Sequence, residues 1–208
     1  MAWGGPGGAA TGPLTLSLKH AILGVLEASP MTGYDLKRFF DGSAEWLWSA
    51  KHSQIYPLLA SLEAEGLVSS EEGVRGEFQR RVVHSLTEAG RAELLSWVGS
   101  VHPQPGERDP FLLQAVFFDM VGDEEVRRVL TAYRDEQREA YEAARAHSLA
   151  LAAGETPLIK ERLRVRPEES GRMRSMKARA FAARAEVARV RWQWAEEYLA
   201  DLTGDPTS

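Results

Sequence analysis

Apolar residues in the N-terminal half of the chain recur at the spacing of an α-helix. The first set, Leu18, Ile22, Leu23 and Leu26, predicts a helix over residues 14–27. Pro30 ends it, because the residue before a proline is pushed out of the α region. A second, short helix is expected from Gly33 to about Phe40, with Thr32 as its cap. Its buried side is expected to hold Tyr34, Leu36, Phe39 and Phe40.

A third helix is predicted to run to Glu65, with Gly66 as its left-handed C-terminal residue. Its apolar stripe is formed by Ile55, Leu58, Leu59 and Leu62. Pro57 is tolerated only in a first turn. The regular helix therefore starts near Ser53, or an earlier turn from Ser49 is kinked, and the first alternative is preferred.

The pattern then changes to two short β-type stretches, residues 67–70 and 80–86, joined by a polar segment that contains two glycines. This indicates a hairpin with a long tip. Thr87 is expected to cap a fourth helix that ends near Gly99. Leu94, Leu95, Trp97 and Val98 are assigned to the apolar side of that helix. Residues 101–110 contain three prolines and are interpreted as a linker.

Three helices, a hairpin and a fourth helix, in that order, indicate a winged helix-turn-helix domain. The rest is predicted to be helical, over 111 to about 151, with a break near Gly122 left open, and over 172 to about 202. The fold class is mostly α, with α+β character only through the wing. The expected division is a tail (1–13), the winged helix (14–100), the linker (101–110), a coiled-coil-like dimerisation domain (111–203) and a tail (204–208).

Composition restricts the chemistry further. The chain has no cysteine, which excludes disulfides, zinc-thiolate sites and a thiol nucleophile. No apolar run approaches the roughly 20 residues that a membrane span needs, and the N-terminus lacks the features of a secretory signal. We therefore expect a cytoplasmic protein that does not contact the membrane. The net charge of −5 means that any contact with DNA phosphates has to be local.

Local features of that kind occur at the start of the third helix and on the hairpin. Polar and cationic side chains cluster at the helix start, where no acidic residue occurs between Glu45 and Glu63; they are Lys51, His52, Ser53, Gln54 and Tyr56. The hairpin carries Arg75, Arg80 and Arg81 against Glu77. Such groups fit a recognition helix in the major groove and a wing along the backbone. The alternative is an ordinary solvated helix face.

Several linked motifs resemble the PadR family of transcription regulators. The similar stretches are LKHAILGVLEASPMTGYDLKRFF, SQIYPLLASLEAEGLV and RRVVHSLTEAGRAEL, which lie between residues 16 and 98. The motifs within them are Gly33-Tyr34, Ile55-Tyr56-Pro57, Leu62-Glu63 with Gly66-Leu67, and Thr87 with Gly90-Arg91. His84 departs from the family, where a tyrosine is more usual.

The resemblance implies Lys51, Ser53, Gln54 and Tyr56 as leading DNA contacts, Lys37 on a phosphate, and Arg75, Arg80 and Arg81 on the wing. Tyr34 is expected to pack in the core. For Tyr56, packing in the core and contact with the DNA groove both stay open. Trp46 and Trp48 suit a packed corner or a ligand pocket. A small aromatic effector is a further family expectation, with Trp46, Trp48, Trp97, Phe111, Phe117 and Phe118 available to line its pocket.

The last predicted helix carries a heptad seam, formed by Met173, Met176, Ala180, Ala183, Val187, Val190 and Trp194. Its partner is either the helix that begins at Phe111 or the same helix of a second subunit; the family implies a homodimer on a palindromic operator. Residues 160–191 hold eleven basic and four acidic residues, a net of +7. Pairing with the acidic residues 123–142 is preferred to a second DNA site.

An enzyme is the competing class, but its parts are missing from the sequence. The five histidines are never within four residues of each other, so no local helical metal pair exists. There is no Walker loop and no G-x-S-x-G motif. We expect no cofactor, no metal and no catalysis. The remaining alternative to a DNA-binding repressor is a winged-helix interaction module that does not bind DNA.

Overall fold

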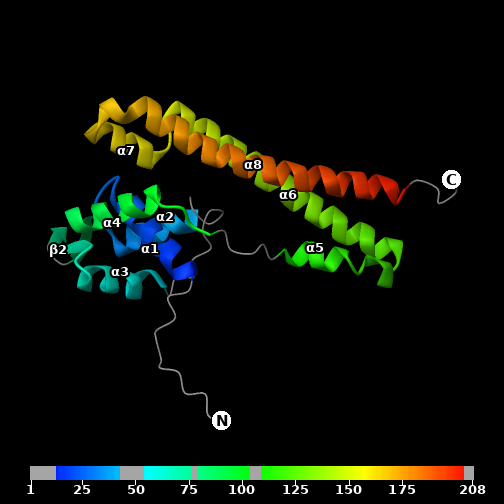
Figure 1. Cartoon of the computed structure of the whole chain (residues 1–208), viewed down its shortest axis with the longest axis horizontal. Helices are drawn as coiled ribbons and strands as arrows, with labels where there is room; N and C mark the ends of the chain where they lie inside the picture. The colour runs from blue at the N-terminus through cyan, green and yellow to red at the C-terminus, as the bar shows by residue number, and fades with distance from the viewer. Residues whose placement is uncertain (1–12, 43–53, 76–78, 104–108, 204–208) are drawn as a thin grey trace, which may run out of the picture. The chain divides into compact units, whose positions relative to one another are not determined.

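The computed structural model describes residues 13–42, 54–75, 79–103 and 109–203. The chain divides into two compact units, Met1–Pro105 and Gly106–Ser208. Each is considered by itself below, and Figure 1 gives the element labels.

The first unit contains helices α1 (Pro13–Leu26), α2 (Gly33–Gly42), α3 (Ile55–Ala64) and α4 (Glu88–Gly99). Its core is formed by the stripes expected from the sequence, including Ile22, Leu23, Leu36, Leu59 and Leu62. Thr32 caps α2 as predicted, because its Oγ1 accepts a hydrogen bond of 3.1 Å from the Asp35 amide.

Three of the expected core positions are wrong. Tyr34 is 63% exposed, and on α4 both Leu95 and Val98 lie at the surface of the structure. Tyr34 belongs to the first turn of α2, where helical spacing alone does not decide which side chains reach the core.

The sheet has three antiparallel strands in the order β1, β3, β2: β1 (Met31–Thr32), β2 (Val68–Arg75) and β3 (Gln79–Leu86). The hairpin β2–β3 is in register from Val68 opposite Leu86 to Arg75 opposite Gln79. This confirms the predicted wing and lengthens its first strand. Strand β1 was not predicted. It pairs Met31 with His84 and Thr32 with Val83.

Two of the sequence motifs meet between α3 and α4. Gly66 has φ +71° and ends α3, and the Leu67 amide donates to the Leu62 carbonyl at 2.9 Å. Thr87 donates to the Gly66 carbonyl at 2.7 Å and accepts from the Gly90 amide at 3.0 Å. A Cβ on Gly90 would lie 2.0 Å from the Leu67 carbonyl oxygen, so only glycine fits there.

The second unit contains α5 (Pro110–Ala115), the 3₁₀ turn η2 (Phe118–Met120), α6 (Asp123–Ala153), α7 (Pro157–Val165), the turn η3 (Pro167–Glu169) and α8 (Ser170–Asp201). The break left open near Gly122 is present. The long helices α6 and α8 lie side by side (Figure 1). Their core cluster is made of Phe118, Val126, Leu130, Tyr133 and Ala195.

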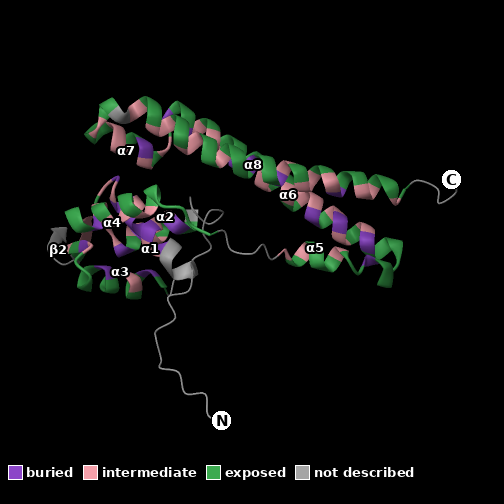
Figure 2. Cartoon of the chain, in the orientation of Figure 1, coloured by how far each residue is buried: buried purple, intermediate pink, exposed green. Residues whose placement is uncertain are grey.

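Much of the surface of α8 is exposed or only half-buried (Figure 2). Its buried residues are Ala185, Ala188 and Ala195, a stripe different from the predicted heptad seam. Within that seam Met176 is 57%, Val187 53% and Val190 57% exposed. Trp194 is the member that packs on the core cluster. Helix α6 therefore leaves most of the seam uncovered.

Candidate nucleic-acid interface

The N-terminal end of α3 has one side in the core and one side exposed. Ile55, Leu59 and Leu62 are buried, whereas Gln54 and Pro57 are exposed and Tyr56 is 54% exposed. The regular helix begins at Ile55, and Pro57 lies in its first turn as expected. Lys51, His52 and Ser53, together with Trp46 and Trp48, lie outside the described residues. Gln54 and Tyr56 thus form the described part of the predicted contact surface.

Tyr56 is positioned by α2. A Cβ built on Gly33 would lie 2.7 Å from Cε1 of Tyr56 and 3.3 Å from its Cδ1. Glycine at the first residue of α2 therefore lets the aromatic ring approach the backbone. The tyrosine combines both roles that the sequence left open, since part of its ring is packed and the rest stays exposed.

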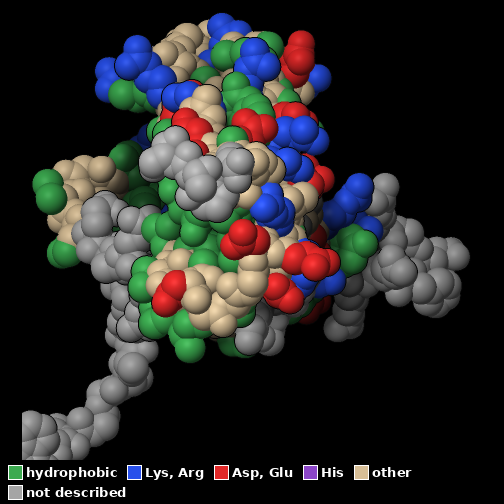
Figure 3. Space-filling view, turned by 90° about the vertical axis from the view of Figure 1, so that its right-hand side faces the viewer, with side chains coloured by type: hydrophobic (Ala, Val, Ile, Leu, Met, Phe, Trp, Pro, Cys, Tyr) green, Lys and Arg blue, Asp and Glu red, His purple; other side chains and the backbone are tan. Residues whose placement is uncertain are grey.

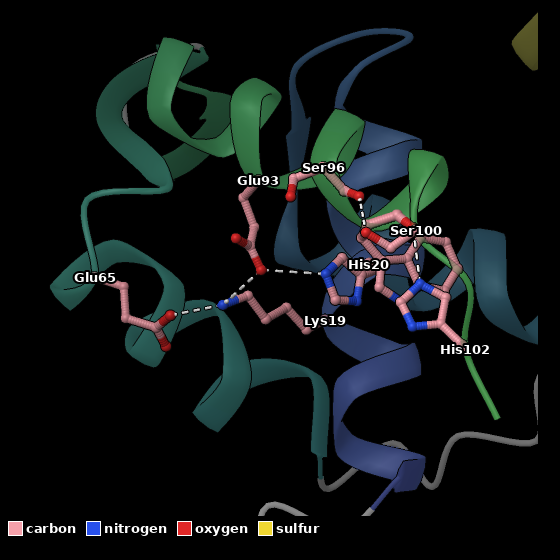
Figure 4. A network of polar contacts seen from close by, with 8 residues as sticks. Lys19, His20, Glu65, Glu93, Ser96, Ser100 and His102 are labelled. Carbon is pink, nitrogen blue, oxygen red and sulfur yellow. Dashed lines mark hydrogen bonds and ion pairs between the residues drawn. The ribbon is translucent and has the colours of Figure 1, made fainter.

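The other end of α3 is connected to α1 and α4 by a polar network (Figure 4). Nζ of Lys19 donates to Oε2 of Glu65 at 2.9 Å and lies 3.5 Å from Oε1 of Glu93. The same Glu93 oxygen lies 3.3 Å from Nε2 of the buried His20. The hydrogen bond from Lys19 lowers the pKa of Glu65. These contacts join the C-terminal end of α3 to α1 and α4.

The wing is less basic than the residues at its tip indicate. Arg81 is exposed, and Arg75 and Arg80 lie in the strands, with side chains outside the described part. However, β2 begins at Val68 and therefore includes Glu71 and Glu72, both exposed. The arginines outnumber the glutamates at the tip of the hairpin, but not over the whole hairpin. Any phosphate contact by the wing is confined to its arginine-bearing end.

His84 ties the two long strands together across the wing. Its Nδ1 lies 3.0 Å from Oγ of Ser70, the residue directly opposite on β2. Burial lowers the pKa of His84, and the charge of Glu63 partly opposes this effect. The folded wing therefore favours the neutral form of the His84 imidazole.

Lys37, the remaining predicted phosphate contact, is in α2 and about two-fifths exposed. Its Nζ lies 3.9 Å from Oδ2 of Asp41, one turn later on the same helix. A surface pair of this length is weak. The ammonium group therefore remains available to an external anion.

The aromatic residues assigned to an effector pocket have packing roles within their own units. Trp97 stacks on His20, with ring centroids 4.5 Å apart, and on His102 at 5.4 Å. Phe118 is buried in the core cluster of the second unit, and Phe111 stacks on Tyr133. Neither unit by itself brings the predicted set together.

Phe117 is the exception, because it is exposed and lines a hollow of about 310 Å³ beside α6. Other apolar residues between α5 and the end of η2 are also exposed: Leu112, Leu113, Val116 and Met120. Hydrophobic side chains also gather between charged groups on the face that Figure 3 views.

The described residues contain no cluster of three histidine, aspartate or glutamate side chains placed to hold a metal ion. Within the same part of the chain, no helix combines the length and apolarity needed to cross a bilayer.

Comparisons with known proteins identify the fold and a family domain in the first unit. Residues 22–96 match the family described as "Transcriptional regulator PadR-like family". The negative transcriptional regulator PadR of Bacillus subtilis is 37% identical over 109 residues, which cover 52% of this chain and 60% of that protein. The alignment with this curated relative thus spans less than two thirds of its length.

Solved structures extend the likeness over both units. B. subtilis PadR in complex with operator DNA has a TM-score of 0.68 at 27% identity, covering 89% of this chain and 99% of that one. The same protein in complex with p-coumaric acid has a TM-score of 0.68 at 26% identity, covering 94% and 100%. The winged helix-turn-helix with its three-stranded sheet and the helical second unit agree with these neighbours, and residues 22–96 form a PadR-like transcriptional regulator domain.

Proposed function

We propose that the chain is a homodimeric repressor that binds a palindromic operator through α3 and the wing. The observation that carries this proposal is the exposed N-terminal end of α3, where Gln54 and Tyr56 stand free of the core and Gly33 positions the tyrosine. Side chains at this end of a second helix-turn-helix helix are those that reach base edges. The contacts proposed beside them are Lys37, Lys51, His52, Ser53, Arg75, Arg80 and Arg81.

Repression and operator binding are supported by what the relatives are described as doing. The B. subtilis relative is a negative regulator, and its structure was solved with operator DNA. A role on chromosomal DNA would place the protein in the cytoplasm. The overall charge of −5 favours the competing interaction module, but the proposed contacts are local and do not need a basic whole surface.

The proposed dimer interface is the exposed seam of α8. Met176, Val187 and Val190 would stay in water in a monomer. These side chains are a little more than half exposed, so covering each one stabilises by about 1 kcal/mol, and a second copy is proposed to cover the seam. Two subunits would present two α3 helices to successive turns of one groove.

Release by a small aromatic acid is the effector proposal, supported by the p-coumaric acid complex of the relative. Phe117 is the best available contact of the six candidate residues. Trp97, Phe111 and Phe118 already pack within their own units. Trp46 and Trp48 lie outside the described residues. Titration of the operator complex with p-coumaric acid tests it. Release of DNA is expected, and an unchanged complex at millimolar acid would contradict the effector proposal.

DNA binding itself is tested by fluorescence anisotropy with the DNA that flanks the coding region, at two salt concentrations. Affinity is expected to fall steeply with salt. Arg81→Ala should weaken binding to all sequences, Gln54→Ala should alter base preference, and Lys160→Ala, on α7, is the control. Absence of binding to flanking DNA at low salt would favour the interaction module.

A further inference from the structure

A second hollow, here called the α6–α8 hollow, lies where these two helices run side by side (Figure 1). Its volume is about 350 Å³, and Ser148 and Ala152 of α6 line it together with residues of the N-terminal part of α8. A volume of this size is at the lower end for sites that bind small molecules. Its lining residues all belong to the second unit, and none of them is in the core cluster or the heptad seam.

Small residues create this space. Ala152, Gly171, Ala178 and Ala182 line the hollow with a methyl group at most. Ala178 and Ala182 are about one turn apart, so they lie on the same side of α8. Longer side chains at these positions would fill the gap between the helices. The surface under the hollow is therefore mostly apolar.

Arg174 is held at the edge of the hollow. Its Nε donates to the Ser170 carbonyl at 3.1 Å. A Cβ built on Gly154 would lie 3.2 Å from Cδ of this arginine and 3.5 Å from its Nη1. Gly154, with φ +78°, ends α6 and leaves room for the guanidinium to pass close to the helix end. The hydrogen bond uses the Nε–H group, which leaves the terminal N–H groups as donors for a ligand.

A second guanidinium and a hydroxyl line the same hollow. Arg179 is exposed and follows Arg174 at about 7.5 Å along the axis of α8. Ser175 lies between them and is also exposed. Ser148 donates its hydroxyl proton to the Ala178 carbonyl at 2.9 Å, so it offers a ligand only an acceptor. The described residues that line the hollow include no aspartate or glutamate, and its charged groups are both positive.

The hollow lies within the most basic stretch of the sequence, residues 160–191, whose net charge is +7. Other arginines of this stretch form ion pairs with carboxylates: Arg164, Arg189 and Arg191. Those carboxylates belong to Glu161, Glu186 and Asp109, and none of the three lines the hollow. The positive charge at the hollow is therefore left to attract an anion.

This lining matches the chemistry of a dianion with an organic part. Guanidinium groups bind phosphates and carboxylates through paired N–H donors, and two of them balance two negative charges. A phosphate or carboxylate group alone would fill only part of the volume, and the methyl groups of Ala178 and Ala182 offer an apolar surface for the rest of the molecule. A hollow of this size accepts a small molecule but not a DNA duplex.

We propose that the α6–α8 hollow binds a small organic dianion, a phosphate monoester or a dicarboxylate. Arg174 and Arg179 contact its charged groups, and the alanine methyl groups contact its organic part. The site is separate from the hollow beside Phe117, and its ligand carries more charge than the aromatic acid proposed as effector. The inference rests neither on the dimer nor on DNA binding.

Calorimetric titration of the full chain tests the site, at constant ionic strength, with phenyl phosphate and succinate as probes. We expect at least one probe to bind with a Kd of about 1 mM or lower. Arg174→Gln and Arg179→Gln should each weaken this binding at least about fivefold, because each removes charge-assisted hydrogen bonds. Arg172→Gln is the matched control, since it removes the same charge from an exposed position of α8 outside the hollow.

A variant that keeps the charge tests the apolar part of the site. Ala182→Leu should fill the hollow and weaken binding of phenyl phosphate about fivefold or more, while inorganic phosphate binds as before. Ala182 is exposed, so the larger side chain does not disturb the core. Ala200→Leu, at an exposed position near the other end of α8, is the control and should leave both affinities unchanged.

The results distinguish a built site from a merely basic surface. Binding that the two lining arginines carry and Arg172 does not would support the site, and the tighter probe would tell a phosphate ester from a dicarboxylate. No binding of either probe at about 10 mM, or equal weakening in all three arginine variants, would overturn it. A loss of operator affinity in Arg174→Gln with probe binding unchanged would assign the arginine to DNA and overturn it as well.

Discussion

The ring of Tyr56 occupies the space where a side chain on Gly33 would begin, with Cε1 2.7 Å from the position of a Cβ. The first residue of α2 thus sets the position of an aromatic side chain at the exposed end of α3. Both residues belong to motifs by which the sequence resembles PadR regulators, and their proximity gives a physical reason for the glycine.

We predict that Gly33→Ala displaces Tyr56 and lowers operator affinity about tenfold, or about 1.4 kcal/mol. The two helices should still form, because alanine is a good helix former. Anisotropy with operator DNA measures the affinity. Gly24→Ala is the control, since a Cβ at Gly24 meets nothing within 4 Å. An unchanged affinity for Gly33→Ala would contradict the positioning role.

A second glycine is predicted to matter for folding. Gly90→Ala would place a Cβ 2.0 Å from the backbone oxygen of Leu67, which cannot move without disturbing the end of α3. We expect a loss of about 2–4 kcal/mol in the free energy of unfolding, measured by urea denaturation. Gly99→Ala, where the added Cβ meets nothing within 4 Å, should cost little. Equal stabilities of the two variants would rule out the close approach.

Thr87 is predicted to contribute more than an ordinary helix cap. Its hydroxyl accepts from the Gly90 amide and donates to the Gly66 carbonyl, so it joins the start of α4 to the end of α3. Thr87→Ala should destabilise the first unit by about 2 kcal/mol, at the upper end for caps. Thr87→Ser keeps the hydroxyl and should recover most of this loss in the same denaturation experiment. A serine variant as unstable as the alanine one would argue against the hydrogen bonds.

His84 is predicted to make the wing sensitive to acid. Burial lowers its pKa in the folded chain below the usual 6.5, so the unfolded chain binds the proton more readily. The contribution of this pKa difference to the free energy of unfolding is complete above about pH 6.5. It is lost as the pH falls through the lower pKa of the folded chain. The Tm should therefore decrease on acidification, and less so in His84→Tyr.

His147, in α6, also has a pKa lowered by burial and titrates in the same direction. A comparison of the Tm–pH profiles of the original chain and the His84→Tyr variant isolates the contribution of the wing, because His147 is present in both. Parallel pH profiles for the original chain and the His84→Tyr variant would contradict the role of the imidazole.

The sequence was sufficient for features set by local chemistry. Thr32, Gly66 and Thr87 mark helix ends through capping and left-handed geometry, and all three act as expected. Strand β1 was missed because two residues form a strand only by pairing with β3, a contact that no local pattern encodes.

Errors arose where tertiary packing decides the outcome. Tyr34 has the spacing of a core residue but is exposed. Trp97 was assigned to a ligand pocket but stacks on His20 and His102. The heptad of α8 predicts a seam, but a sequence cannot say which partner covers it. The structure shows that α6 uses a different stripe. Glu71 and Glu72 belonged to the polar segment of the predicted hairpin but were not counted against its arginines; the structure places them in β2.

Contact between DNA and the exposed ends of two α3 helices can be seen by nuclease footprinting on the flanking DNA. We predict two protected half-sites, with centres about 10 base pairs or a multiple of this apart on one face of the duplex. Gln54→Ala should weaken protection of both half-sites. A single protected half-site, or a footprint that the Gln54→Ala variant leaves unchanged, would contradict the account.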